Sequence, residues 1–138
     1  MPKMIFVSLP VKDLAASTRF YEAIGCEKNP QFSDDNTSSM MWSDTITFML
    51  LTHDYYSSFT AKPIADAHRA SPMMIGLSLD SREAVDAIVD AAAGAGGSTD
   101  LRPAQDLGFM YQRTFEDPDG NSFEPVWLNP EASFPEPA

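Results

Sequence analysis

Residue types that often carry out chemistry are few in this chain of 138 residues, which contains one cysteine and two histidines. Cys26 follows Gly25 at the expected end of a helix, where the helix dipole disfavours a thiolate. His68 lies in a long connecting segment without a second ligand residue at metal-binding spacing, and the sequence shows no Cys-His constellation. We therefore expect a structural cysteine and no thiol nucleophile.

Aromatic side chains offer a different chemistry, which is stacking on a flat ligand. One group lies in or beside predicted strands and comprises Trp42, Phe48, Tyr111 and Trp127. The alternative for this group is packing in the core. A second group, Tyr55, Tyr56 and Phe59, lies in the connection between the two halves of the chain. A connection of this length in a compact protein is usually functional or mobile.

The charge balance excludes one class of partner. Nine Lys and Arg against 20 Asp and Glu give a net charge of −11. Such a surface repels phosphate backbones and attracts cations over long range, so we expect no nucleic-acid binding.

No apolar stretch approaches the roughly 20 residues that cross a bilayer, so we expect no membrane partner. The single cysteine is typical of a cytoplasmic protein.

The first half of the chain reads as a strand, a helix and three further strands. An apolar run over residues 5–11 predicts the first strand. Asp13 is a suitable N-cap for a helix near residues 14–24, which Gly25 ends. An extended stretch over 27–33 and strands over 39–42 and 45–52 follow.

The second half repeats that order. A strand over residues 73–79 precedes a helix over about 83–95, and Asp80 with Glu83 resembles a capping box. An extended stretch over 98–104 and strands over 109–115 and 121–128 follow. Within the turn between the last two strands, Gly120 can adopt a left-handed conformation.

These patterns predict an α+β fold made of two βαβββ modules that form a concave cleft. The modules cover about residues 4–53 and 73–128 of one domain, residues 1–129. The connection spans residues 54–72, and residues 130–138 form a proline-rich tail.

Two segments resemble a known family. Residues 5–25, IFVSLPVKDLAASTRFYEAIG, and residues 115–125, FEDPDGNSFEP, are similar to the opening and closing motifs of the vicinal oxygen chelate superfamily. The chain most resembles its glyoxalase/bleomycin resistance group, whose members are often labelled lactoylglutathione lyase-like. The resemblance implies the fold and leaves the reaction open, because one scaffold hosts several chemistries.

The resemblance also implies where a metal ion would bind. Metal-dependent members take ligands from the first and last strands of each module, and these positions correspond here to Phe6, Leu50, Met74 and Glu124. Three of them lack a hard donor, and a thioether is a poor ligand for Zn²⁺, Ni²⁺ or Mg²⁺. A catalytic zinc needs about three protein ligands. We therefore expect no metal and no other cofactor.

The same positions predict the binding site. Alternate residues of a strand share a face, and module symmetry brings the two modules' residues to one concave surface. We therefore expect a ligand to contact Phe6, Phe48, Leu50, Met74 and Glu124. Glu124 could act as a general base, as the counter-charge of a cation or as a hydrogen-bond partner of Arg113; neighbouring hydroxyls or water could instead satisfy it. Arg113 could hold a ligand carboxylate or lie on an outward face.

Three functions remain open. The first is a metal-free module that sequesters a small cationic or aromatic molecule. The second is a glyoxalase-class lyase for a small carbonyl or thioester substrate, with Glu124 as the catalytic residue. The third is a degenerate domain that pairs with another protein. We expect a homodimer in each case, from the resemblance and from apolar surface that one small chain leaves uncovered.

Overall fold

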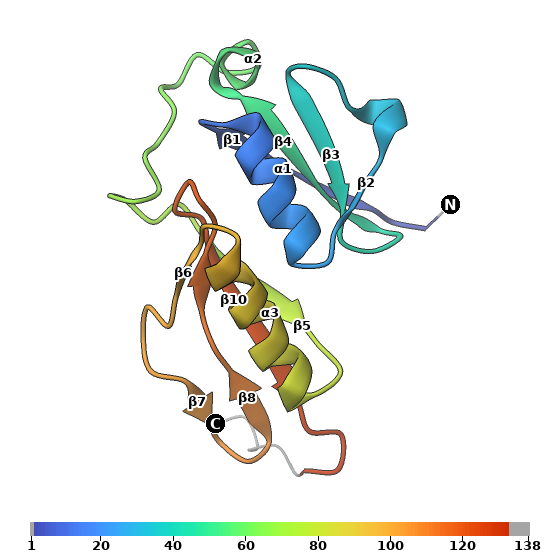
Figure 1. Ribbon diagram of the computed structural model, residues 1–138, viewed down its shortest axis with the longest axis vertical. Helices are drawn as coiled ribbons and strands as arrows, with labels where there is room; N and C mark the ends of the chain where they lie inside the picture. The colour runs from blue at the N-terminus through green and yellow to red at the C-terminus, as the bar shows by residue number, and fades with distance from the viewer. Residues whose placement is uncertain (1, 133–138) are drawn as a thin grey trace. The chain divides into compact units, whose positions relative to one another are not determined.

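The computed structural model describes residues 2–132. The chain divides into two compact units, residues 1–70 and 71–138. Each unit contains one sheet and one long helix that packs against it (Figure 1). The predicted α+β class is therefore confirmed.

The first unit has four strands in the order β1-β4-β3-β2. Strand β1 (Ile5–Val11) runs parallel to β4 (Ile46–Thr52). Strand β3 (Thr37–Met41) pairs antiparallel with β4 and with the short β2 (Glu27–Lys28). Helix α1 (Leu14–Ala23) connects β1 to β2.

Two short helices lie where the sequence predicted none. The extended stretch expected over residues 27–33 is interrupted by a 3₁₀ turn, η1 (Pro30–Phe32), whose start is capped by the Asn29 side chain. Proline is well suited to the first position of a helical turn, where an amide hydrogen has no partner. A second short helix, α2 (His53–Ser57), directly follows β4 and is capped by Thr52.

The second unit repeats the strand order with more breaks. Strand β5 (Met74–Ser78) runs parallel to β10 (Ser122–Leu128), and α3 (Arg82–Gly94) packs against the sheet. The other side of β10 pairs with two short strands, β8 (Met110–Gln112) and β9 (Phe115–Glu116). These pair in turn with β7 (Gln105–Asp106) and β6 (Ser98–Thr99). Each unit thus has the predicted βαβββ order, with two strands of the second unit split.

The predicted helix starts are right for one helix and wrong by one residue for the other. Asp13 caps α1, and its Oδ1 accepts a hydrogen bond from the Ala16 amide at 3.0 Å. Ser81, not Asp80, caps α3, because the Ser81 hydroxyl accepts from the Ala84 amide at 3.0 Å. The D-x-x-E capping box expected at Asp80 is therefore absent.

Side chains alternate between the two faces of each sheet, and one face forms the core under the helix. In the first unit, the Phe48 ring lies 5.5 Å from that of Tyr21 in α1. In the second unit, the rings of Phe115 and Phe123 stack at 5.0 Å, and both residues are buried. We call the opposite side of each sheet its helix-free face. This face is where residues remain available for function.

Candidate functional site

The helix-free face of the first sheet differs from the predicted cleft wall. The strand register places Phe6 beside Thr47 and Ser8 beside Met49. Phe48 and Leu50 lie between these positions, so they point toward α1, and they are 1% and 0% exposed. Phe6 is 60% exposed. The expectation that Phe6, Phe48 and Leu50 share a surface is therefore wrong, because a shift of one residue along a strand reverses the face.

The two registers also correct the correspondence between the units. Phe6 pairs with Thr47 in the first unit, and Met74 pairs with Ser122 in the second. Glu124 lies two residues after Ser122, and the residue two after Thr47 is Met49. The position in the first unit that corresponds to Glu124 is therefore Met49 and not Leu50.

A pocket of about 650 Å³ lies within the first unit. Its floor is part of the helix-free face and contains Ser8, Thr37, Met49 and Leu51. Its rim comes from η1 and its following residues, and from α2 and its following residues. The rim consists of Gln31, Phe32, Ser33, Asp34, Tyr55, Tyr56, Phe59 and Thr60.

The aromatic side chains of this pocket come from short elements that the sequence did not predict as structured. The rings of Tyr55 and Phe59 make an edge-to-face contact at 5.0 Å. Phe59 is 67% exposed and Phe32 61%. The cluster of Tyr55, Tyr56 and Phe59 in the connecting segment was visible in the sequence. Phe32 could not be identified from the sequence, because the residues around it do not indicate which strands it would lie over.

The helix-free face of the second sheet is polar around Glu124. Gly76 and Glu124 pair across β5 and β10, and Gln112 pairs with Val126, two residues after Glu124. Met74 lies on the same face and is exposed. The Nη2 group of Arg102 donates to the Glu124 carboxylate and, at 2.9 Å, to Gln112 Oε1. Glu124 thus already forms an ion pair with the Arg102 guanidinium. Arg102 is a site residue that sequence reasoning missed.

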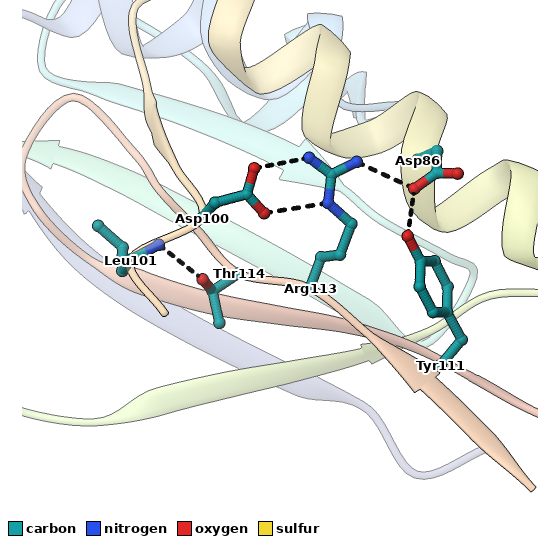
Figure 2. Close-up of polar contacts among 6 residues, drawn as sticks. All are labelled: Asp86, Asp100, Leu101, Tyr111, Arg113 and Thr114. Carbon is teal, nitrogen blue, oxygen red and sulfur yellow. Dashed lines mark hydrogen bonds and ion pairs between the residues drawn. The ribbon is translucent and has the colours of Figure 1, made fainter. Parts of the chain in front are cut away.

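Arg113 lies on the other side of this sheet, away from Glu124. Its guanidinium donates to Asp86 of α3 at 2.9 Å and to both carboxylate oxygens of Asp100 at 3.1 and 2.7 Å. The Tyr111 hydroxyl donates to the same Asp86 oxygen at 2.7 Å (Figure 2). Arg113 therefore connects α3 to the chain after β6, and the pairing with Glu124, one of the roles that the sequence left open, is not formed.

These contacts shift the ionisation of the groups involved. The Tyr111 hydroxyl, followed by the Arg113 guanidinium, lowers the pKa of Asp86. The Arg113 guanidinium lowers the pKa of Asp100, and the two carboxylates raise the pKa of Arg113 in return. All three groups are therefore charged at neutral pH, and the network contributes to the structure of the second unit.

The residues present do not fit the metal ion that the family resemblance implies. The corrected positions are Phe6, Met49, Met74 and Glu124, which supply one hard donor, and Arg102 already occupies that donor. Within residues 2–132, no group of three His, Cys, Asp or Glu side chains is arranged to hold a metal ion.

The Cys26 side chain is buried. Burial raises the pKa of the Cys26 thiol to about 12, which keeps it protonated at neutral pH. This agrees with a structural cysteine.

Among residues 2–132, no helix combines the length and the apolar character needed to span a bilayer.

Solved structures similar to this chain share its fold. Hypothetical protein SA1046 from S. aureus is 23% identical, with a TM-score of 0.77 over 93% of this chain and 95% of its own. A glyoxalase/bleomycin resistance protein/dioxygenase family enzyme from Burkholderia phytofirmans PsJN is 18% identical, with a TM-score of 0.75 over 93% and 100%. Fosfomycin resistance protein FosX from Mesorhizobium loti is 15% identical, with a TM-score of 0.68 over 94% and 95%.

Sequence comparison gives the family. A search of curated proteins found no match. A family model, in contrast, matches residues 3–124, which include all the strands of the first unit and the first three residues of β10, ending at Glu124. The chain therefore belongs to the Glyoxalase/Bleomycin resistance protein/Dioxygenase superfamily.

Proposed function

We propose that this protein binds a small, flat, largely apolar molecule in the pocket of the first unit, without a metal ion. The observation that carries the proposal is the pocket itself, about 650 Å³ in volume and lined by Phe32, Tyr55, Tyr56 and Phe59. That volume is typical of small-molecule sites. Aromatic side chains stack on flat rings, and the methionine of the floor adapts to ligands of varied shape.

The charges around the pocket favour a ligand with a positive group. Asp34 is the acidic residue of the lining. Its Oδ1 accepts a hydrogen bond from the Asn36 amide at 2.8 Å, which fixes the carboxylate at the rim. The net charge of −11 adds a long-range attraction for cations. Asp34 thus takes the role of counter-charge that the sequence had suggested for Glu124.

The contacts of Glu124 argue against a glyoxalase-class lyase that uses it as a free base. A general base must reach the proton that it abstracts and must have a lone pair available. Glu124 Oε2 accepts a hydrogen bond from Arg102 Nη2, so the lone pair that faces Arg102 is already used. These contacts support binding as the function in preference to catalysis centred on Glu124.

Isothermal titration calorimetry with two matched probes tests the proposal. We expect 1-methylquinolinium, a flat cation, to bind more tightly than the neutral 1-methyl-2-quinolone. Phe59→Ala and Phe32→Ala should each weaken both probes about tenfold, because each removes a stacking surface. Asp34→Asn should weaken only the cation, and added salt should have the same selective effect.

Two controls distinguish this pocket from the site around Phe6 that the sequence predicts. Phe6→Ala changes an exposed phenylalanine on the same sheet that lies outside the pocket lining, so it should leave both affinities unchanged. Dialysis against EDTA should also leave them unchanged. Loss of binding after EDTA treatment, or a loss in Phe6→Ala equal to that in Phe59→Ala, would contradict the proposal.

We also propose that the protein is a homodimer. Equivalent strands of the two units begin with exposed apolar side chains, Ile5 and Phe6 in β1 and Met74 in β5, preceded by Met73. Exposed apolar groups at interfaces contribute binding energy when a partner covers them. Light scattering at micromolar concentration should give about twice the chain mass of 15.2 kDa. The mass of a single chain would refute this assembly.

A further inference from the structure

The chain bends sharply just before Arg102. Asp100 has a φ of +53°, and within residues 2–132 it is the one non-glycine residue with positive φ. A positive φ is uncommon for residues other than glycine, although aspartate adopts it more readily than most. The bend lies between β6 (Ser98–Thr99) and β7 (Gln105–Asp106). A conformation of this kind persists where surrounding contacts hold it, and such positions are frequent at ligand sites.

Contacts on both sides of the bend hold it in place (Figure 2). The Asp100 carboxylate accepts two hydrogen bonds from Arg113, which also binds Asp86 of α3. The Asp100 amide donates to the Thr114 carbonyl at 2.8 Å. The Leu101 amide donates to the Thr114 hydroxyl oxygen at 2.9 Å. The backbone that carries Arg102 is therefore fixed to both the helix and the sheet.

From this position the Arg102 side chain reaches the helix-free face of the second sheet. Both of its hydrogen bonds, to Glu124 and Gln112, use Nη2. The N–H groups of Nε and Nη1 have no hydrogen-bond partner among the described residues. The side chain is 42% exposed. Beside Glu124, a Cβ added at Gly76 would meet one neighbouring atom, the Glu124 carbonyl oxygen at 3.9 Å, so the surface there is open.

We propose that Arg102 is the centre of a binding site for a carboxylate group, with Glu124 and Gln112 as the residues that position it. A guanidinium presents planar donors that match a carboxylate, and donors already fixed in place lose less entropy on binding. This site belongs to the second unit and is separate from the pocket proposed above. It lies at the position where the resemblance would place a metal ligand.

The ion pair with Glu124 limits the affinity that we expect Arg102 to have for a carboxylate. Glu124 neutralises the charge of Arg102 without using the donors on Nε and Nη1. The acidic surface repels anions only over about the 8 Å screening length at physiological salt. Recognition therefore depends on short-range hydrogen bonds, and a simple carboxylate should bind with millimolar affinity.

Arginine-selective NMR of the full chain tests the proposal by following the Nε–H resonance of Arg102. Its assignment comes from its loss in Arg102→Gln. Titration with benzoate should shift this resonance to saturation, whereas benzamide, its neutral analogue, should not. The Arg113 resonance should stay in place, because its Nε–H already donates to Asp100 at 3.1 Å.

Two variants separate binding from a purely structural ion pair. Arg102→Lys keeps the charge and loses the planar donors, so benzoate shifts of neighbouring backbone amides should need about tenfold more ligand. Gln112→Leu removes one positioning contact and should weaken benzoate about threefold while the Arg102 resonance stays observable. A shift with chloride at the same ionic strength equal to that with benzoate would overturn the proposal. So would unchanged affinity in Arg102→Lys. Neither result depends on quinolinium binding in the first unit.

Discussion

The two units have the same strand order and an equivalent register, yet their helix-free faces differ. In the first unit this face is the floor of an aromatic pocket, and the position equivalent to Glu124 is Met49. In the second unit it carries the cluster of Arg102, Gln112 and Glu124. The faces under the helices are alike, since both are packed with buried apolar and aromatic side chains. The core under each helix thus maintains the shared fold, and the opposite face is free to acquire different chemistry.

The largest expected effect tests which residue of the first unit corresponds to Glu124. Leu50→Glu would place a carboxylate in the core under α1, where it finds no partner, and should cost about 3–5 kcal/mol of unfolding free energy or prevent folding. Met49→Glu would place the same group on the helix-free face, where Met49 is half-buried, and should cost about 1 kcal/mol. Urea unfolding measures both. Equal losses would show that the two side chains do not point to opposite faces.

This comparison also explains what the sequence could and could not predict. The βαβββ order follows from apolar periodicity, from Asp13 as a helix start and from Gly25 as a helix end, which are local signals. Leu50 and Met49 are neighbouring residues in a strand that carries apolar side chains on both faces, so alternation gives no preferred face. The register with β1 decides between them, and that pairing is not local in sequence.

The site residues divide in the same way. The aromatic cluster in the connecting segment was recognisable, because three rings in a polar stretch are unusual. Arg102 was not, because its role depends on the bend at Asp100 and on contacts with two distant strands. The hydrophobic periodicity of a sequence does not reveal residues whose position depends on the conformation of a loop.

The second prediction concerns the ion-pair network that is specific to the second unit. Arg113→Met removes the guanidinium between Asp86 and Asp100 and should cost about 1–2 kcal/mol at pH 7, since both carboxylates are partly exposed. Arg69→Met is the matched control. Its ion pair with Asp66 is far more exposed, and its loss should cost less than about 0.5 kcal/mol.

The network also predicts a pH dependence. The pKa of Asp100 and that of Asp86 are lowered in the folded protein, so their stabilising contribution is present above the unfolded pKa of about 3.9. It is lost as the pH falls below that value and through the lowered folded values. The difference between wild type and Arg113→Met in urea unfolding should therefore be largest near pH 7 and shrink below about pH 4. A difference that is independent of pH would indicate that Arg113 acts by packing alone.

The smallest effects compare the helix starts of the two units. Asp13→Ala and Ser81→Ala each remove a side-chain oxygen that accepts a hydrogen bond at 3.0 Å from the first turn of α1 or α3. Each should cost about 1 kcal/mol of unfolding free energy. Asp80→Ala should cost less than about 0.5 kcal/mol, because Asp80 precedes the cap. Urea unfolding of the three variants decides the matter, and a loss in Asp80→Ala as large as that in Ser81→Ala would restore Asp80 as the cap. Similar losses in Asp13→Ala and Ser81→Ala would show that both units use one kind of helix start, although their helix-free faces have diverged.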